Sequence, residues 1–304
     1  IPTSDTDYAG WLGVSVLEDA ADTRKALPKA VDWLVVDHYG LDAEWESAFK
    51  GYANQIFVID DLANRPHDCD LLLDQNYAGD GADRYKGWVS NDCTQLLGPA
   101  FAMLHPAFRE QRLAAASHRN DHQAIERIFV FFGGTDPDNL TGRALEALSE
   151  PNLAHLTVDC VVGANNPHQP TLTNIAEQRG NVVMHPPQPH LADLMAQADL
   201  AIGAGGTTTW ERCALGLPSI VVSIAENQRP ACNLLSKDGY IHYLGHHNAV
   251  TAADIAAAVH QLIDSPEQRR QLAKASAQLV DGQGTQRVVE CMFSMAKGQS
   301  AACH

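Results

Sequence analysis

The chain runs DLAIGAGGTTTWERCALGLP between Asp199 and Pro218, and this stretch decides the fold. It begins with an apolar strand pattern that ends in glycines, and the threonines that follow open a helix pattern. Glycine lets an anion approach the backbone closely, while the first turn of a helix offers free N–H donors and partial positive charge. The stretch therefore predicts an α/β domain that binds an anionic group, such as a diphosphate, at Gly203–Glu211.

A tight turn without a ligand is the alternative interpretation of the same residues. The glycines would then only shape the turn, Thr207 or Thr208 would cap the helix, and Glu211 would complete a capping box. A carboxylate at Glu211 can instead accept hydrogen bonds from both hydroxyls of a ribose. Glycine content alone does not separate the two interpretations.

Short apolar runs alternate with helical patterns along the chain, which is typical of parallel sheets covered by helices on both faces. The predicted strands are 33–37, 55–59, 71–73, 128–132, 156–162, 182–185, 200–202 and 219–222. The predicted helices include 18–27, 139–148, 170–179, 190–198, 208–214, 229–238, 252–264 and 267–279. The fold class is therefore α/β, with doubly wound parallel sheets.

The length of 304 residues favours two domains, and a polar segment at 109–127 separates them. We predict an N-terminal Rossmann-like domain at 1–120, a C-terminal nucleotide-binding domain at 121–290 and a tail without periodicity at 291–304. The first domain offers only about three strands, whereas such sheets usually have about five or six. The N-terminal domain is thus expected to be truncated.

The charge balance limits the partners. The chain has 21 basic and 37 acidic residues and a net charge of -16, which disfavours nucleic acid and anionic membrane surfaces. No apolar run approaches the roughly 20 residues of a membrane helix. The seven cysteines are scattered and never form a C-x-x-C pair, and no signal peptide precedes the first motifs, so a cytoplasmic protein with reduced thiols is expected.

Polar side chains also follow the predicted strand at 219–222. Glu226, Asn227 and Gln228 come shortly after its end. Ligands of open α/β sheets bind outside the carboxyl ends of the strands. We therefore expect these side chains to lie beside the glycine turn.

A second glycine turn, GGTD at 133–136, opens the first helix pattern of the second domain. It lacks the Gly-Lys-Ser/Thr of a P-loop and the G-x-G-x-x-G spacing of a dinucleotide site. We interpret it as a wall of the ligand cleft, with Asp138 or Asn139 capping the helix. A turn and cap without any ligand contact is the alternative.

Motifs of the second domain resemble a known family. They read GGTTTWE at 205–211, ALGLP at 214–218 and ENQ at 226–228. In this order they resemble the donor-binding half of the GT-B glycosyltransferases similar to the enzyme that adds N-acetylglucosamine to lipid I. The resemblance implies a GT-B-like architecture of two facing domains.

Motifs that precede them narrow the resemblance. They are VVDHYG at 35–40, IDDLANR at 59–65, HDCDLLLDQN at 67–76, LGP at 97–99 and FGGTDPDN at 132–139. Together these motifs resemble the UDP-2,4-diacetamido-2,4,6-trideoxy-β-L-altropyranose hydrolases of pseudaminic acid biosynthesis. The similarity extends from about residue 11 to about residue 289.

The resemblance implies hydrolysis of a UDP-linked diacetamido-trideoxy hexose without a metal or a cofactor. Water attacks the anomeric carbon with inversion, and UDP leaves. The implied catalytic residues are Asn227 and Tyr39, the latter on the N-terminal side of the cleft. The implied substrate-binding residues are Gly134, Gly205, Gly206, Thr207, Thr208, Thr209, Glu211, Asn227 and Gln228.

Among these residues the threonines would flank the phosphates, Glu211 would hold the ribose, and Asn227 and Gln228 would face the sugar. Two other functions stay open. One is a UDP-sugar-dependent GT-B glycosyltransferase, which shares the nucleotide site. The other is a fragment that binds the nucleotide without reacting.

The family's general base is expected on a glycine-rich loop with a histidine after its first strand. This chain has no Gly-x-Gly-His loop, and its first glycine is Gly10. His38, which follows a predicted strand, could take over that role, although a positioning role is the more frequent one for such a residue. The upstream loop is therefore expected outside this sequence.

Other polar clusters have simpler interpretations. Asp60 and Asp61 should point to opposite faces of a strand end, which favours turn chemistry over a shared proton. Neither the histidines at 242–247 nor the HDC motif at 67–69 shows ligand spacing for a metal, so both are interpreted as solvated loops.

Overall fold

The computed structural model describes residues 8–27, 29–79, 83–121 and 124–297. The chain forms two compact units, of which the first combines Ile1–Met103 with Gly284–His304 and the second is Leu104–Gln283. No helix in the described part of the chain is both long and apolar enough to cross a membrane.

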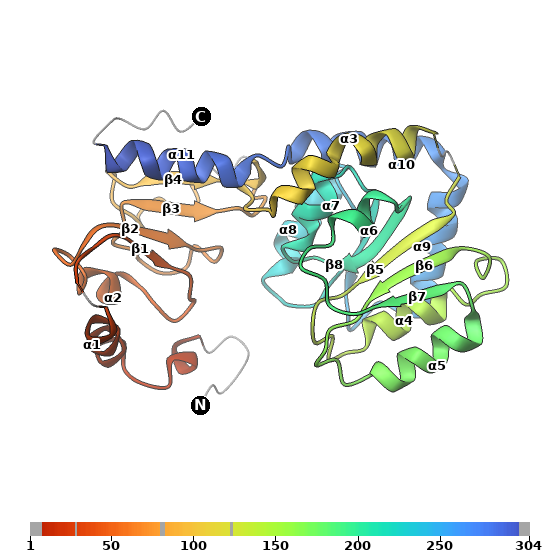
Figure 1. Ribbon diagram of the computed structural model, residues 1–304, viewed down its shortest axis with the longest axis horizontal. Coiled ribbons are helices and arrows are strands. Elements are labelled where there is room, and N and C mark those ends of the chain that lie inside the picture. The colour runs from red at the N-terminus through yellow and green to blue at the C-terminus, as the bar shows by residue number, and fades with distance from the viewer. Residues whose placement is uncertain (1–7, 28, 80–82, 122–123, 298–304) are drawn as a thin grey trace. The chain divides into compact units, whose positions relative to one another are not determined.

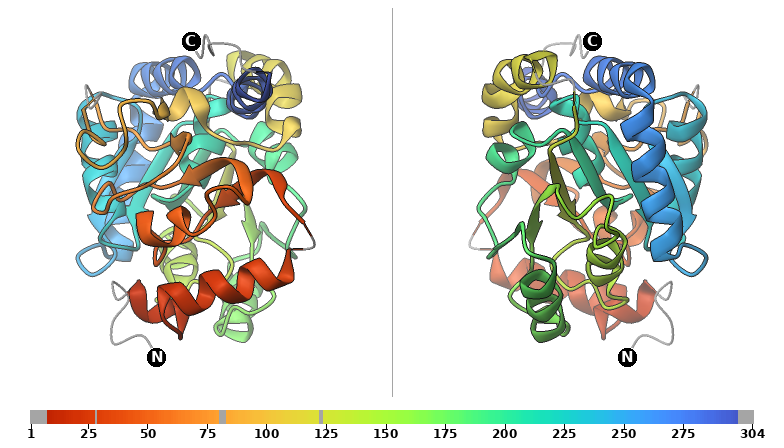
Figure 2. Two further views of the ribbon diagram at one scale, coloured as in Figure 1. Left: turned by 90° about the vertical axis from the view of Figure 1, so that its left-hand side faces the viewer. Right: turned by 90° about the vertical axis from the view of Figure 1, so that its right-hand side faces the viewer.

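The first unit contains a four-stranded parallel sheet in the order β1-β2-β3-β4. Its strands are β1 (Val31–Val36), β2 (Ala53–Ile59), β3 (Leu71–Asp74) and β4 (Thr94–Leu97). Its helices are η1 (Ala9–Leu12), α1 (Val16–Ala26), α2 (Ala43–Ser47), η2 (Pro99–Phe101) and α11 (Gly284–Ala296). Helices α1 and α2 lie on one side of this sheet, and α11 lies along β3 and β4 on the other (Figures 1 and 2).

Successive side chains of the strands in the first unit pack into two separate cores, because side chains along a strand point alternately to the two faces of the sheet. Ile56 and Val58 pack in the cluster that also contains Trp45 of α2. Their neighbour Phe57 packs with Leu71 in the cluster that contains Val288 and Cys291 of α11. Both faces of the sheet are therefore covered by helices.

The second unit contains a six-stranded parallel sheet in the order β10-β9-β8-β5-β6-β7. Its strands are β5 (Arg127–Phe131), β6 (Thr157–Val161), β7 (Val182–His185), β8 (Leu200–Ala204), β9 (Ser219–Ser223) and β10 (His242–His246). Its helices are α3 (Pro106–Asp121), α4 (Leu140–Ala147), α5 (Gln169–Arg179), α6 (Ala192–Ala196), α7 (Thr208–Ala214), α8 (Gln228–Lys237), α9 (Ala252–Asp264) and α10 (Pro266–Leu279).

The helices of the second unit form two groups. Helix α4 packs against α5 and α9, whereas α3 packs against α6 and α7, and α7 packs against α10. Figure 1 shows α4 and α5 below the sheet and α3, α6 and α7 above it. Every residue of β8 and β9 is consequently buried, which explains their unbroken apolar sequence. The predicted fold class, doubly wound α/β, is confirmed.

Two strands were not predicted from the sequence, β4 and β10. Strand β4 reads TQLL and is short, while β10 reads HYLGH and is half-buried. Strand β10 pairs with β9 through His242 and Ile220. The interpretation of the histidines at 242–246 as a solvated loop is therefore wrong, because backbone pairing with a buried strand places them at the edge of the sheet.

The division of the chain also differs from the expectation of 1–120, 121–290 and 291–304. The polar segment after Leu104 forms α3, which packs on α6 and α7 of the second unit. At the other end α11 continues to Ala296, and Cys291 is buried in the first unit. The division therefore falls at Met103 and Gln283, and the first sheet has four strands rather than about three.

The HDC motif at 67–69 is likewise not a solvated loop. His67 is buried, and its Nδ1 lies 2.7 Å from Oε1 of the buried Glu46. The other oxygen of Glu46 accepts a hydrogen bond from the backbone N–H of Asp68. Asp60 accepts from the backbone N–H of Ala63, so the predicted turn chemistry at that residue is confirmed.

We expect Glu46→Ala to lower the free energy of unfolding by about 3 kcal/mol, because His67 and the Asp68 N–H would lose their buried partner. Chemical denaturation measures the change. Glu44→Ala, on the exposed side of the same helix, is the matched control and should change stability by less than about 0.5 kcal/mol. Equal stabilities of the two variants would contradict this account of the pair.

Candidate functional site

The carboxyl ends of β5 and β8 form the centre of the candidate site. These strands are neighbours, with Phe131 opposite Gly203. The chain continues from β5 toward β6 and β7, and from β8 toward β9 and β10, so the strand order reverses between them. Open α/β sheets bind ligands at such a reversal, outside the carboxyl ends of the strands.

Two glycines at this edge of the sheet lie too close to neighbouring atoms for a side chain. A Cβ at Gly203 would lie 2.6 Å from the Phe131 carbonyl oxygen and 2.9 Å from Nη1 of Arg212. A Cβ at Gly163 would lie only 1.8 Å from the carbonyl oxygen of Gly134. Glycine is therefore required at both positions, one near the end of β8 and one just after β6.

Helix α7 begins directly after the second glycine loop. Thr207 stands at its N-cap without a side-chain capping bond, and Glu211 does not bond back to it. The structure therefore contradicts the capping box. The predicted cap of α4 is confirmed, because the Asn139 side chain accepts from the backbone N–H of Gly142.

Glu211 carries an unsatisfied buried group. Its Oε2 is buried and has no hydrogen-bond partner. Burial raises the pKa of Glu211 from 4.5 to about 7, although the nearby Arg212 acts in the opposite direction. A buried carboxylate oxygen without a donor is unfavourable, and a pair of ligand hydroxyls would satisfy it.

Arg212 is a site residue that the sequence motifs did not indicate. Its guanidinium is buried and donates to the Ala204 carbonyl at 2.8 Å and to Oγ1 of Thr209 at 3.0 Å. It also donates to Oγ1 of Thr208 at 3.1 Å. Residues four apart share a helix face, so the pair at 208 and 212 is the signal that could have revealed it.

The three threonines have different environments. Thr207 is exposed and Thr208 is half-buried at the start of α7. Thr209 is buried, and its hydroxyl oxygen contacts Arg212 and the Ala204 carbonyl. Thr209 is therefore the most buried of the three threonines, and its hydroxyl already has partners within the protein.

Gln228 lies against the glycine loop, as expected. Its Oε1 accepts from the backbone N–H of Ile224 at 2.9 Å. Its Nε2 lies 3.4 Å from where a Cβ would stand at Gly206, and its Oε1 lies 3.5 Å from that point at Gly205. Asn227 precedes α8 with an exposed side chain that makes no capping bond.

Tyr39 and His38 belong to the first unit, at the end of β1. Burial raises the pKa of Tyr39, and the Asp61 carboxylate raises it further. Nδ1 of His38 accepts a hydrogen bond from the backbone N–H of Gly40 at 3.0 Å. A neutral His38 therefore carries its proton on Nε2, which does not suit a general base.

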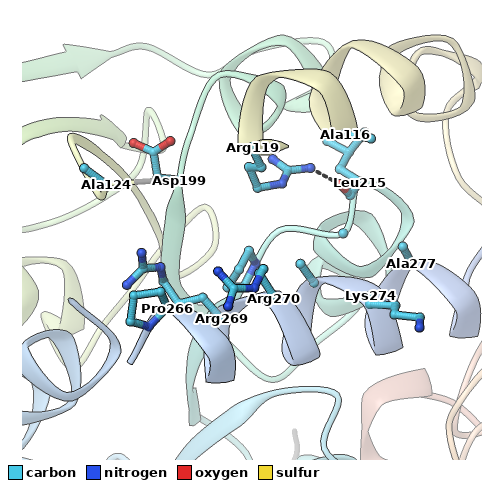
Figure 3. A pocket seen from close by; sticks show the side chains of 13 residues that line it. Ala116, Arg119, Ala124, Asp199, Leu215, Pro266, Arg269, Arg270, Lys274 and Ala277 are labelled. Atoms are coloured by element: carbon cyan, nitrogen blue, oxygen red, sulfur yellow. Dashed lines mark hydrogen bonds between the residues drawn. The ribbon is translucent and has the colours of Figure 1, made fainter. Parts of the chain in front are cut away.

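A cavity of about 500 Å³ lies at the opposite edge of the second sheet. It is next to Asp199 and Pro218, which precede β8 and β9, and α10 supplies much of its wall (Figure 3). None of the predicted site residues lines it. Among the described residues, no group of three or more His, Cys, Asp or Glu side chains could hold a metal ion.

Comparison with known proteins gives several relatives. A spore coat polysaccharide biosynthesis protein of Bacillus subtilis, SpsG, is 28% identical over 87% of this chain and 77% of its own length. The UDP-2,4-diacetamido-2,4,6-trideoxy-beta-L-altropyranose hydrolase of Campylobacter jejuni is 24% identical over 68% of this chain and 72% of its own.

A further relative, from an Exiguobacterium strain, is an N-acetylglucosamine transferase that uses UDP-N-acetylglucosamine. It is 30% identical over 54% of this chain and 46% of its own length.

Solved structures share the fold. Acinetobacter baumannii MurG superposes with a TM-score of 0.63 at 13% identity, over 92% of this chain and 78% of its own. The UDP-GlcNAc 2-epimerase of Neisseria meningitidis, solved with UDP-GlcNAc bound, gives a TM-score of 0.62 at 13% identity, over 92% of this chain and 82% of its own. These neighbours confirm the GT-B-like fold.

The family described as Glycosyltransferase family 28 C-terminal domain matches residues 127–288. This range contains both glycine loops, Glu211, Arg212 and Gln228, and it is more than half of the 304 residues. The fold described above agrees with this match, and the chain belongs to the glycosyltransferase family 28 C-terminal domain family.

Proposed function

We propose that the chain binds a UDP-sugar at the carboxyl ends of β5 and β8 and hydrolyses the bond between UDP and the anomeric carbon. The observation that carries the proposal is the buried, unpartnered Oε2 of Glu211. It lies in the first turn of the helix that follows a glycine loop, where the two hydroxyls of a ribose can donate to it.

Each neighbouring group has a part in this proposal. The backbone of Gly205 and Gly206 and the hydroxyls of Thr207 and Thr208 bind the diphosphate. Gln228, which already contacts the glycine loop, faces the sugar together with its neighbour Asn227. Gly134 forms the wall of the site on the β5 side.

One relative supports hydrolysis in particular. The Campylobacter jejuni hydrolase matches over 68% of this chain, more than the 54% of the Exiguobacterium transferase. In the proposed step the water oxygen forms a bond to the anomeric carbon while the bond from that carbon to the diphosphate oxygen breaks. UDP keeps the bonding electron pair, and the net reaction releases the proton of the water to solvent.

Transfer of the sugar to another acceptor is the second candidate. It is favoured by the family to which the chain belongs and by the 30% identity to the transferase. The nucleotide site would be the same in both reactions. They differ only in the nucleophile, which is a hydroxyl of an acceptor in place of water.

Incubation of the protein with a UDP-linked diacetamido-trideoxy hexose and no acceptor should release UDP and free sugar in equal amounts. Chromatography of the nucleotide together with ¹H NMR of the anomeric proton measures both products and reports inversion. UDP release that occurs only after an acceptor sugar is added would contradict hydrolysis and support transfer.

Glu211→Ala should weaken the binding of UDP about tenfold or more, because hydrogen bonds to a charged group contribute about 1.5–3 kcal/mol. Calorimetric titration with UDP and with 2′-deoxy-UDP tests the ribose assignment. The wild type should prefer UDP, and the variant should bind both ligands alike. If the variant still preferred UDP over 2′-deoxy-UDP, the assignment of Glu211 to the ribose would be wrong.

Glu211→Gln should make the unliganded protein more stable at pH 8. A carboxyl group whose pKa rises on folding favours the native state below its ordinary pKa of 4.5, and this contribution is lost as the pH rises through about 7. The full loss corresponds to about 3 kcal/mol.

Denaturant unfolding of the wild type and of Glu211→Gln at pH 4.5 and pH 8 measures the difference. The variant should gain stability relative to the wild type only at the higher pH. Glu177→Gln, an exposed carboxylate on α5 of the same unit, is the control and should show no such pH dependence. A gain of equal size at both pH values would contradict the explanation that burial raises the pKa of Glu211.

A further inference from the structure

Arg212 is a buried cation without an anionic partner. Its side chain is 1% exposed, and its hydrogen bonds go to neutral acceptors only: the Ala204 carbonyl and the hydroxyl oxygens of Thr208 and Thr209. Its Nε has no partner. Within the described residues no carboxylate forms an ion pair with it, although Glu211 is its neighbour in sequence and the charges of the two residues influence each other.

Such a charge is unfavourable in the folded protein. An arginine keeps its proton even when burial lowers its pKa, as it does here. Taking a guanidinium out of water costs free energy that a counter-anion must offset. The unliganded protein does not supply this anion among its described residues, which indicates that a ligand does.

The contacts of Arg212 indicate where that ligand lies. Its Nη1 comes within 2.9 Å of the point where a Cβ would stand at Gly203, so the glycine makes room for the guanidinium directly under the loop. The same Nη1 donates to Oγ1 of Thr208, which leaves the proton of that hydroxyl free to point to an anion above the loop. Arg212 therefore lies behind the backbone that faces the ligand.

We propose that Arg212 is the fixed positive charge that balances the diphosphate of the bound nucleotide, acting from beneath the glycine loop through the hydroxyl of Thr208. Arg212 is on this view a positioning residue, since it does not touch the ligand itself. The inference rests on the proposed function and adds the source of the charge that makes this site prefer a diphosphate over a neutral nucleoside.

The ratio of the affinities for UDP and for uridine tests the inference, because uridine has the same base and ribose without the phosphates. Arg212→Gln should lower this ratio by a factor on the order of 30, since a charge a few ångströms from the phosphates is lost. Calorimetry with UDP and NMR titration with uridine measure the two affinities. Arg212→Met is a second neutral variant, whose flexible side chain fills the same space without unpaired donors.

Two further variants separate charge from packing. Arg212→Lys keeps the charge and should keep most of the ratio. Arg269→Gln removes another buried arginine of the second unit, which lies on α10 and donates to the carbonyls of Leu262 and Ile263 at the end of α9. It should lower stability and leave the ratio unchanged.

The outcomes distinguish the two proposals. A wild type that binds neither UDP nor uridine overturns the proposed function itself. A wild type that binds UDP, with neutral variants that lose UDP and uridine affinity in equal proportion, overturns the role of Arg212 alone. A selective loss of UDP affinity in Arg212→Gln or Arg212→Met, but not in Arg212→Lys, supports it.

Discussion

The parallel pairing of β5 with β8 is the constraint on which the rest of the site depends. Phe131 and Gly203 are partners across this pair, and the Phe131 carbonyl comes so close that Gly203 must lack a side chain. The missing side chain makes room for the guanidinium of Arg212, and that guanidinium binds the threonines at the start of α7. The close contact between the Phe131 carbonyl and Gly203 is thus linked, through Arg212, to the hydroxyls of Thr208 and Thr209.

Glu211 and Arg212 are adjacent residues of opposite charge that do not neutralise each other. Each has a buried polar atom without a partner, Oε2 in one and Nε in the other. A protein selected for stability alone would replace both groups with apolar ones. Their presence in one short helix is typical of a site whose buried polar groups gain partners only from a ligand, because function and stability favour different side chains there.

Much of the second unit could be predicted from local sequence, and the reasons are physical. Strands β8 and β9 are buried on both faces, so their residues form continuous apolar runs that a pattern detects. Strand β10 is half-buried at the edge and carries histidines, and only its pairing with β9 makes it a strand. The GT-B-like fold followed from ordered motifs, which reflect many strands and turns at once.

The site could be predicted only in part. Glycines, threonines and Glu211 stand in one continuous stretch, so sequence places them together. The burial of Thr209 and the positioning role that we infer for Arg212 depend on which face of α7 meets the sheet, and a motif in the sequence does not specify that orientation. The boundary of the units was missed for a similar reason, because α11 returns to a sheet whose strands lie far earlier in the chain.

That return has a consequence for biosynthesis. Leu104–Gln283 leaves the ribosome before α11, and at about 5–20 residues per second its synthesis takes roughly 10 to 40 seconds. During this interval the apolar side chains of Phe57, Leu71 and Leu73 lack the helix that buries them in the folded protein. The first unit to be translated is therefore the last to be completed, and one face of its sheet lacks its covering helix while the second unit is synthesised.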